Sequence, residues 1–261
     1  MKTTLNKTRF TVLIMSTILL VFSTLTLRAQ EEAAKEKKWN FLAAPYLLFP
    51  NMSGEITVKG IPSDASANTE DIFSNLDLGG MLYFEANNGK WAIILDGYYV
   101  GLSAEGVTPL LSRKTGIEMN QFAIAIGGLY RVASWAEVGI AGRVNSIGST
   151  LTIAPGEYVL QGGEYSMDET WFDPLIVTRT MTRFNGSKWR LGLEAGFGGF
   201  GIGSDYAYQI NPFVGYQPIK LLEIVVSYRW DGMKYETGSE TDLFVYDVLL
   251  QGPSLGFVFH F

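Results

Sequence analysis

Charged side chains recur at even spacings inside otherwise apolar segments of this chain. Arg190 and Glu194 stand four residues apart in WRLGLEAGFGGF. Glu223, Arg229 and Asp231 alternate with apolar residues in LEIVVSYRWD. In an extended strand, an even spacing places side chains on the same face of the sheet. The residues that this parity places on one common face are Glu85, Asp96, Glu137, Arg143, Asp173, Arg179, Arg190, Glu194, Glu223, Arg229 and Asp231.

Such a set of charges allows two kinds of chemistry. Carboxylates and guanidinium groups that face one another could line a narrow polar path for small solutes or ions. They could equally form ion pairs and hydrogen bonds that fill an enclosed space. We favour the second interpretation, because a barrel with few strands fills its interior with its own side chains. The narrow channel stays open as the alternative.

The content of histidine and cysteine limits the enzymatic chemistry that is possible. The chain has one histidine, His260, and no cysteine, so a Ser-His-Asp arrangement has only one candidate base and a Cys-His pair is impossible. A carboxylate pair such as Glu85 with Asp96 could perform acid-base work, but packed ion pairs explain such residues more simply. Metal sites could use only oxygen ligands in the acidic loops. We therefore predict no enzymatic activity, no catalytic residue, no metal site and no cofactor.

The sequence pattern around these charges predicts β-strands. In residues 135–146, WAEVGIAGRVNS, apolar residues alternate with small or charged ones, which is the period of a strand and not of a helix. Tight turns are expected at 87–90, 132–134, 185–188 and 217–220. They alternate with polar links near 55–77, 103–115, 148–170 and 232–242, and with a shorter link near 203–206.

Short turns at one end and long links at the other predict an all-β, transmembrane, up-and-down antiparallel barrel of about ten strands. Eight and twelve strands stay open, because EITVKG is either a separate strand or an extension of the first one. DIFSNLDLGG is expected to form a short helical turn inside the first link. Strands are expected to begin near Trp39, Trp91, Trp135, Trp189 and Leu222, and to end near Ala86, Arg131, Phe184, Tyr216 and Phe261.

Aromatic residues gather at the tight-turn ends of the expected strands. A membrane barrel concentrates amphipathic aromatic side chains where the bilayer meets water. Trp171 and Trp230 are expected near the opposite end. The residues expected to form an interfacial aromatic girdle at the tight-turn end are Trp39, Trp91, Tyr130, Trp135, Trp189 and Tyr216.

The first residues differ in composition from the rest of the chain. Residues 1–29 combine basic residues, the apolar stretch 10–27 and a small-residue cleavage site, so they read as a secretory signal peptide. Residues 30–38 form a short charged tail, and residues 39–261 form the expected barrel. The formal net charge of -6 becomes more negative once the basic segment is removed, which argues against nucleic acid as a partner.

The chain ends in SLGFVFHF. Ser254, Gly256, Phe259 and Phe261 resemble the C-terminal assembly signal of bacterial outer-membrane β-barrels, in which alternating aromatic residues close the last strand. By parity, Phe259 and Phe261 face lipid and His260 faces inward. Residues 244–250 have their apolar residues at the opposite parity, so a β-bulge is expected at 252–253 to restore the register.

The resemblance implies a setting and a set of partners, but no subfamily. A barrel of this family resides in the outer membrane of a Gram-negative bacterium and contacts its lipids and lipopolysaccharide. The barrel-assembly machinery and periplasmic chaperones would act during biogenesis. The expectation is therefore a non-enzymatic outer-membrane barrel with a charge-filled lumen and extracellular loops, in a structural or surface-interaction role. The alternative is a narrow, porin-like channel for a small solute or ion.

Overall fold

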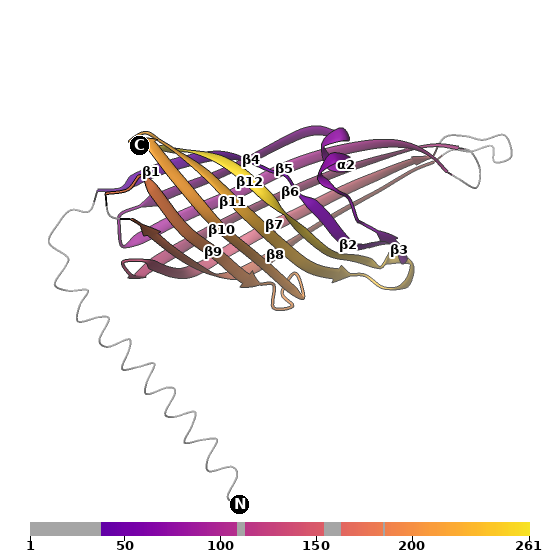
Figure 1. Cartoon of the computed structure of the whole chain (residues 1–261). Coiled ribbons are helices and arrows are strands. Elements are labelled where there is room, and N and C mark those ends of the chain that lie inside the picture. The colour runs from indigo at the N-terminus through magenta and orange to yellow at the C-terminus, as the bar shows by residue number, and fades with distance from the viewer. Residues whose placement is uncertain (1–37, 109–112, 154–162, 185) are drawn as a thin grey trace, which may run out of the picture. The chain divides into compact units, whose positions relative to one another are not determined.

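A closed barrel accounts for most of the structure. The computed structural model describes residues 38–108, 113–153, 163–184 and 186–261. Its strands form one antiparallel sheet, which closes because β1 pairs with β12 on one side and with β4 on the other (Figure 1). The ten strands of the wall are β1 (Asn40–Leu48), β4 (Leu76–Asn87), β5 (Trp91–Thr108), β6 (Arg113–Ala133), β7 (Ala136–Ile153), β8 (Gly163–Arg183), β9 (Trp189–Gly198), β10 (Tyr206–Ile219), β11 (Leu222–Thr237) and β12 (Phe244–His260). The predicted ten-stranded barrel is confirmed.

Further elements lie between β1 and β4 and before β12. They are β2 (Asn51–Val58), β3 (Ile61–Asp64), α2 (Thr69–Ser74) and a 3-10 turn (Glu240–Asp242). β2 pairs with β12 and β3 pairs with β2, so most of EITVKG belongs to a separate strand. The first half of DIFSNLDLGG lies in α2, as expected, but its second half, from Leu76, belongs to β4. The helix α2 begins with a capping box, in which Asn68 Oδ1 accepts from the backbone N of Asp71 at 3.0 Å.

Tight turns and longer links lie at opposite ends of the barrel. At one turn the side chain of Asn88 accepts hydrogen bonds from the backbone N of Lys90 (3.0 Å) and of Trp91 (2.9 Å). Gly89 follows with φ 81°, a conformation that glycine adopts without strain. We call this end the short-turn end and the opposite end the long-loop end. The chain closes at the short-turn end, where Phe261 N donates to Phe41 O at 2.8 Å.

Five strands run further toward the long-loop end than the sequence predicts. β11 continues to Thr237, into the link expected at 232–242. β5 and β6 stay paired up to Thr108 and Arg113, and β7 and β8 stay paired up to Ile153 and Gly163. Most of the links expected at 103–115 and 148–170 is therefore strand. The prediction was wrong because these segments combine polar residues and glycines with few apolar ones, so the sequence alternation is weak although the backbone ladder continues. Residues 109–112 and 154–162, in the same links, lie outside the described residues.

β12 keeps one register along its whole length with β11. The pairs run without a shift from Leu222 with Phe259 to Thr237 with Phe244. The bulge predicted at 252–253 is therefore wrong, and Phe244 lies inside the barrel, 1% exposed. The parity argument failed because the barrel interior is apolar in its long-loop half, so both faces of β12 carry apolar residues there. Gly252 lies instead where the neighbour of β12 changes from β1 to β2, and a Cβ on it would meet the carbonyl oxygen of Phe49.

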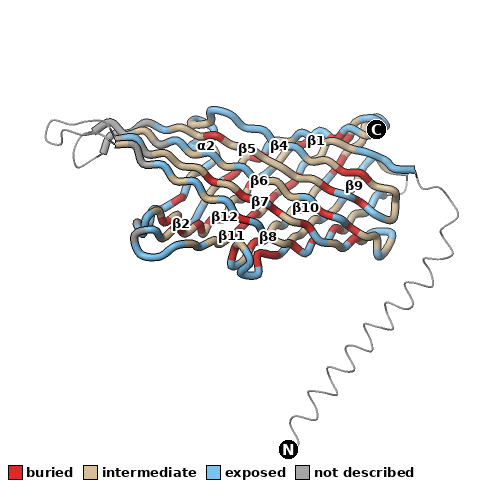
Figure 2. Tube along the Cα trace, turned by 180° about the vertical axis from the view of Figure 1, so that it is seen from behind, coloured by how far each residue is buried: buried red, intermediate tan, exposed pale blue. Residues whose placement is uncertain are grey.

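The two faces of the sheet differ in the way that a membrane wall requires. Buried and exposed positions alternate along the strands, as the red and blue segments in Figure 2 show. The outward face carries large exposed apolar side chains, which would be costly in water and favourable in lipid. Of the helices in the described part of the chain, none is long and apolar enough to cross a bilayer. Exposed apolar residues of the wall include Ile93, Ile126, Ile140, Ile176, Phe197 and Val226.

Candidate functional site

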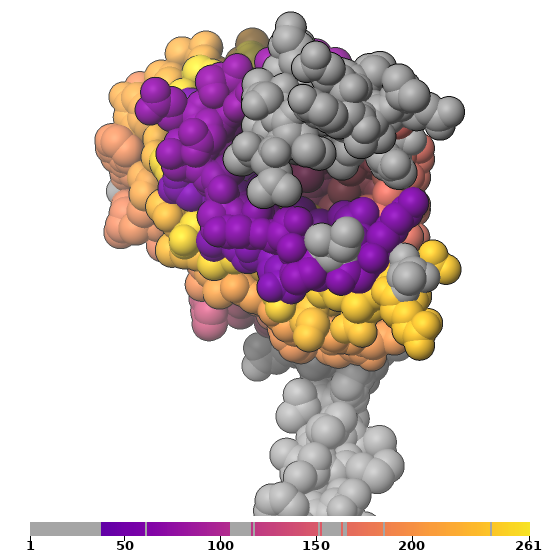
Figure 3. Space-filling view, turned by 90° about the vertical axis from the view of Figure 1, so that its right-hand side faces the viewer, coloured from indigo at the N-terminus to yellow at the C-terminus, as the bar shows by residue number. Residues whose placement is uncertain are grey.

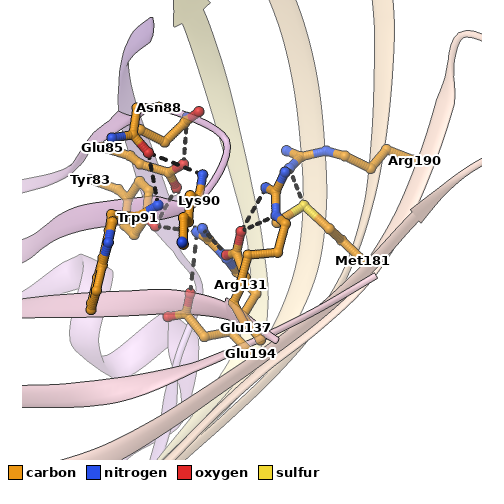
Figure 4. A network of polar contacts seen from close by, with 12 residues as sticks. Tyr83, Glu85, Asn88, Lys90, Trp91, Arg131, Glu137, Met181, Arg190 and Glu194 are labelled. Carbon is orange, nitrogen blue, oxygen red and sulfur yellow. Dashed lines mark hydrogen bonds and ion pairs between the residues drawn. The ribbon is translucent and has the colours of Figure 1, made fainter. Parts of the chain in front are cut away.

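A first group of charges lies inside the barrel near the short-turn end (Figure 4). Arg179 on β8 donates from Nη2 to Glu137 Oε2 at 2.6 Å and from Nη1 to Glu85 Oε2 at 2.5 Å. It also donates to the hydroxyl of Tyr83 at 2.8 Å. Arg131 holds the second oxygen of Glu137 at 2.6 Å. Arg179 is 5% exposed and therefore joins β4, β7 and β8 within the interior. We call Tyr83, Glu85, Arg131, Glu137, Arg179 and Glu194 the short-turn cluster.

Glu194 is held less tightly than the other acids of this cluster. Its Oε2 lies 4.0 Å from Arg179 Nη1, while the two better-placed acids occupy the near donors of that guanidinium. Arg190, four residues earlier on β9, instead donates from Nε to Glu223 Oε1 at 2.8 Å. Glu223 also contacts the ring of His260 at 3.3 Å. The two charges of WRLGLEAGFGGF thus share a face but belong to different groups.

A second group crosses the middle of the barrel. Arg229 on β11 donates from Nη2 to Asp96 Oδ2 on β5 at 3.0 Å and from Nη1 to the hydroxyl of Tyr46 on β1 at 2.8 Å. Tyr46 in turn donates to Asp96 at 2.7 Å, and Arg229 also donates to Gln209 at 2.8 Å. β5 and β11 are not neighbours in the sheet, so the contact between Arg229 and Asp96 spans the interior. We call Tyr46, Asp96, Arg143, Asp173, Gln209, Arg229 and Asp231 the central cluster.

The central cluster extends to the opposite wall through Asp231. Arg143 on β7 donates to Asp231 on β11 at 3.0 Å, and its Nη2 lies 3.6 Å from Asp173 Oδ2. Asp173 is 0% exposed and has further donors around it. Asn145 Nδ2 donates to it at 2.8 Å, and the backbone N of Ser204 does so at 2.7 Å. Each charge of this group therefore has a partner on another strand, which a buried charge requires.

An aromatic layer lies above the central cluster, toward the long-loop end. Trp171 lies toward this end, where the sequence predicts it, but its side chain points into the barrel and is 5% exposed, so it is not an interfacial residue. Its ring stacks on Tyr235 with centroids 4.2 Å apart, and its Nε1 donates to Ser204 Oγ at 2.9 Å. Gln121 on β6 donates to the hydroxyl of Tyr246 on β12 at 3.3 Å, again across the interior. The polar network is thus covered by packed rings.

The charged residues expected to share a face all point inward, and each has an ion-pair partner among the described residues. Parity also gives Tyr83, Arg131 and His260 the same inward face, so a signal for them was present in the sequence. Ser204 is different, because it lies in the turn at 199–205 that folds into the barrel mouth, and no periodicity marks it. In the part of the chain that the structure describes, no group of three or more His, Cys, Asp or Glu side chains is placed to hold a metal ion.

The expected girdle residues lie at the short-turn end, where four of them form two close pairs between neighbouring strands. Trp91 meets Tyr130 edge-on with ring centroids 4.8 Å apart, and Trp189 lies 4.8 Å from Tyr216. Trp39 and Trp135 are exposed on the same rim. At the C-terminus, Phe259 and Phe261 face outward, and Gly256 is buried against Tyr46, whose Cβ lies 3.3 Å from where a glycine side chain would begin. Ser254 bonds to Ser227 through their hydroxyl oxygens.

Comparisons with known proteins bear on the fold. No protein-family model matches the sequence, and no curated protein matches it. Among solved structures, the outer membrane protease OmpT from Escherichia coli is similar with a TM-score of 0.53 and 12% identity, over 85% of this chain and 97% of that chain. The attachment invasion locus protein Ail of Yersinia pestis gives a TM-score of 0.37 and 12% identity, over 85% of this chain and 98% of that chain. Only the first score is high enough to bear on the architecture. The closed ten-stranded barrel and this similarity give the chain the fold of the bacterial outer-membrane β-barrels, without assigning it to a subfamily.

Proposed function

We propose that this chain is an integral protein of the bacterial outer membrane, without enzymatic activity, whose lumen is closed by its own side chains. The observation that carries the proposal is the set of contacts that cross the interior between strands that are not neighbours. Arg229 to Asp96, Arg143 to Asp231 and Gln121 to Tyr246 each join opposite walls. A solute would have to break these contacts in order to pass. Breaking one buried ion pair leaves an unpaired charge and costs about 3 to 5 kcal/mol.

The role that follows is structural or one of surface interaction through the long-loop end. β5, β6, β7 and β8 extend past the ends of their neighbours there and form a projecting ribbon (Figure 1). At this level β5 no longer pairs with β4 and β8 no longer pairs with β9, so each outer edge of the ribbon offers backbone groups to which a partner could bind. The cleaved signal at 1–29, the contacts with lipid and lipopolysaccharide, and the passage through chaperones and assembly machinery belong to the same proposal.

The absence of enzymatic activity rests on where the candidate groups lie. His260, the one histidine, contacts Glu223 near the short-turn end, whereas the barrel mouth with the long links lies at the other end. The acids of both clusters are engaged with arginines or hydroxyl groups and are shielded from bulk solvent. The similarity to a protease in fold does not transfer an activity, because unrelated functions share this architecture.

A narrow channel is the second candidate, and one observation favours it. A cavity of about 120 Å³ lies between the two clusters, lined by Arg179, Glu194, Arg229 and Asp96 among others. That volume is large enough for a few water molecules, each of which occupies about 30 Å³ in the liquid. If the ion pairs of the short-turn cluster and of the central cluster opened, a continuous water-filled path would allow ions to pass.

Liposome swelling separates the two candidates. Folded protein in liposomes should give no swelling in a small sugar such as arabinose. The double variant Arg229→Ala with Asp96→Ala removes a cross-lumen pair without leaving an unpaired charge, so it should swell faster. Swelling of the unaltered protein at the rate of an open porin would contradict the closed lumen.

The location has its own test, which uses epitope tags in two turns. A tag inserted between Gly238 and Ser239 enters a link at the long-loop end, and a matched tag between Ser134 and Trp135 enters a tight turn. Antibody added to intact cells should bind only the first tag. Both tags should become accessible after the outer membrane is permeabilised. Binding to the second tag alone, or to neither on cells that contain folded barrel, would contradict the proposed location and orientation.

A further inference from the structure

The wall of the barrel is not hydrogen-bonded over its full height. β1 pairs with β4 only as far as Pro45 and Leu82. Beyond that level the chain bends at 49–50 and continues as β2 along β12. Residues 76–81 of β4 pair with β5, and no other strand of the described chain pairs with them. A gap in the ladder therefore separates the long-loop half of β4 from β2.

The helix α2 lies over this gap. Phe73 stacks on Phe49 at the bend, with ring centroids 5.4 Å apart, and Thr69 Oγ1 donates to Pro50 O at 2.9 Å. Ile72, also on α2, has a buried side chain. Seen from the long-loop end, the indigo segment that holds these elements lies across the barrel mouth beside the yellow β12 (Figure 3). α2 therefore bounds the opening on its long-loop side, and the opening faces outward through the wall of the barrel.

A cavity of about 270 Å³ passes through the gap. Its inner lining includes Tyr98 and Met119, which point into the barrel from β5 and β6. Its outer lining includes Leu47, which is 52% exposed on the outer wall, and Gly80 on the unpaired edge of β4. Because residues of both faces line one cavity, the cavity joins the interior to the apolar outer surface.

The chemistry of the lining selects an apolar occupant. Leu48, Ile72, Val100 and Leu102 contribute branched apolar side chains. Met52, Met81 and Met119 add flexible ones, which adapt to ligands of varied shape. An apolar cavity of about 150 Å³ already stays dry and takes up benzene. The present cavity is larger and opens toward lipid, so a hydrocarbon chain fits it better than water does.

The charges around the cavity indicate which head group the chain would carry. Among the described residues of the lining, Arg229 is the only cation, and it is engaged by Asp96 at 3.0 Å and by Asp231 at 3.5 Å. Asp71, on α2 beside the gap, adds a carboxylate to the rim. An anionic head group would therefore meet an acid and no free lining cation, whereas a neutral head group would meet no such repulsion.

We propose that the cavity between β1, α2 and β4 binds the hydrocarbon chain of a neutral amphiphile, which enters sideways from the membrane through the gap. The site does not depend on whether the lumen conducts, because it lies in the long-loop half and opens through the wall. The chain could belong to a resident membrane lipid or to a free small amphiphile, since both offer the same group to the cavity.

Photolabelling in proteoliposomes tests the proposal. A 1-dodecanol that carries a diazirine on its chain should label Tyr98 or Met119 inside the barrel, as read by peptide mapping. Unlabelled 1-dodecanol should compete better than dodecanoate at pH 7. A phosphatidylethanolamine with the diazirine in its acyl chain forms a second arm. Interior labelling by the lipid that free alcohol does not displace would assign the chain to a resident lipid.

Two glycines supply a matched pair of variants. A Cβ built on Gly80 or on Gly128 of β6 meets no atom within 4 Å, so a larger side chain can begin at either position on the outer wall. Gly80→Phe fills the gap and should reduce interior labelling about tenfold, equal to about 1.4 kcal/mol of binding free energy. Gly128→Phe should leave it unchanged. Leu102→Phe fills the cavity from within and should act like Gly80→Phe. Labelling confined to the outer wall, or equal interior labelling of both glycine variants, would overturn the proposal.

Discussion

Replacement of Arg179 by methionine probes the ion pairs that hold the barrel interior together. The guanidinium donates to Glu85 at 2.5 Å and to Glu137 at 2.6 Å, and it is 5% exposed. Glu137 keeps Arg131 at 2.6 Å after the change, whereas Glu85 and Glu194 lose the cation that faces them. We therefore expect the loss of one buried ion-pair hub, about 3 to 5 kcal/mol of unfolding free energy, and not twice that amount.

Arg183→Met is the matched control on the same strand. Arg183 is four residues further along β8 and has the same inward parity, but its side chain is 43% exposed and 4.0 Å from Glu223. Its loss should cost about 0 to 1 kcal/mol, as for other exposed pairs. Adding Glu85→Gln to Arg179→Met should restore part of the stability, because it removes an unpaired charge.

The assay is equilibrium urea unfolding of the refolded barrel in lipid vesicles, followed by tryptophan fluorescence and checked by gel mobility without heating. A change in the midpoint at constant slope reports the stability difference. Equal, small shifts for Arg179→Met and Arg183→Met would refute the view that the short-turn cluster is a buried structural network.

Three other changes test separate parts of the structure. Trp171→Ala should cost about 3 to 5 kcal/mol in the same unfolding assay, because it leaves a cavity in the interior and removes the stack on β11. Phe259→Ala together with Phe261→Ala should lower the yield of folded barrel in outer-membrane fractions, and an unchanged yield would exclude a role of the terminal motif in assembly. Gly198→Ala should impair folding, because its Cβ would collide with a backbone carbonyl of β8, while Gly128→Ala should be neutral on the same unheated gel.

The architecture was predictable because a barrel wall repeats one simple pattern. Two-residue alternation fixed the inward face of Arg190 and Glu194, and Asn-Gly signals fixed turns such as the one at Gly89. The same pattern misled at β12, where Phe244 and Phe257 are both apolar but face opposite sides. Periodicity identifies a face only when the two faces differ in chemistry, and in the long-loop half of β12 they do not.

The partners inside the barrel could not be predicted. Arg229 and Asp96 are 133 residues apart and lie on strands that do not touch in the sheet, so their contact depends on the diameter and stagger of the closed barrel. The departure of the chain from β1 to β2 at Pro50, which opens the gap beside β4, likewise has no periodic signal. A polar link of that composition could equally have remained outside the wall.

Single-channel conductance of the folded mature protein in a planar bilayer tests most directly whether the interior is closed. We predict no channel conductance for the unaltered protein, and discrete channel openings for the double variant that combines Arg229→Ala with Asp96→Ala. Discrete, reproducible openings of the unaltered protein, changed in size by Arg190→Gln or Glu194→Gln, would mean that the charges line a conducting path and would contradict the account.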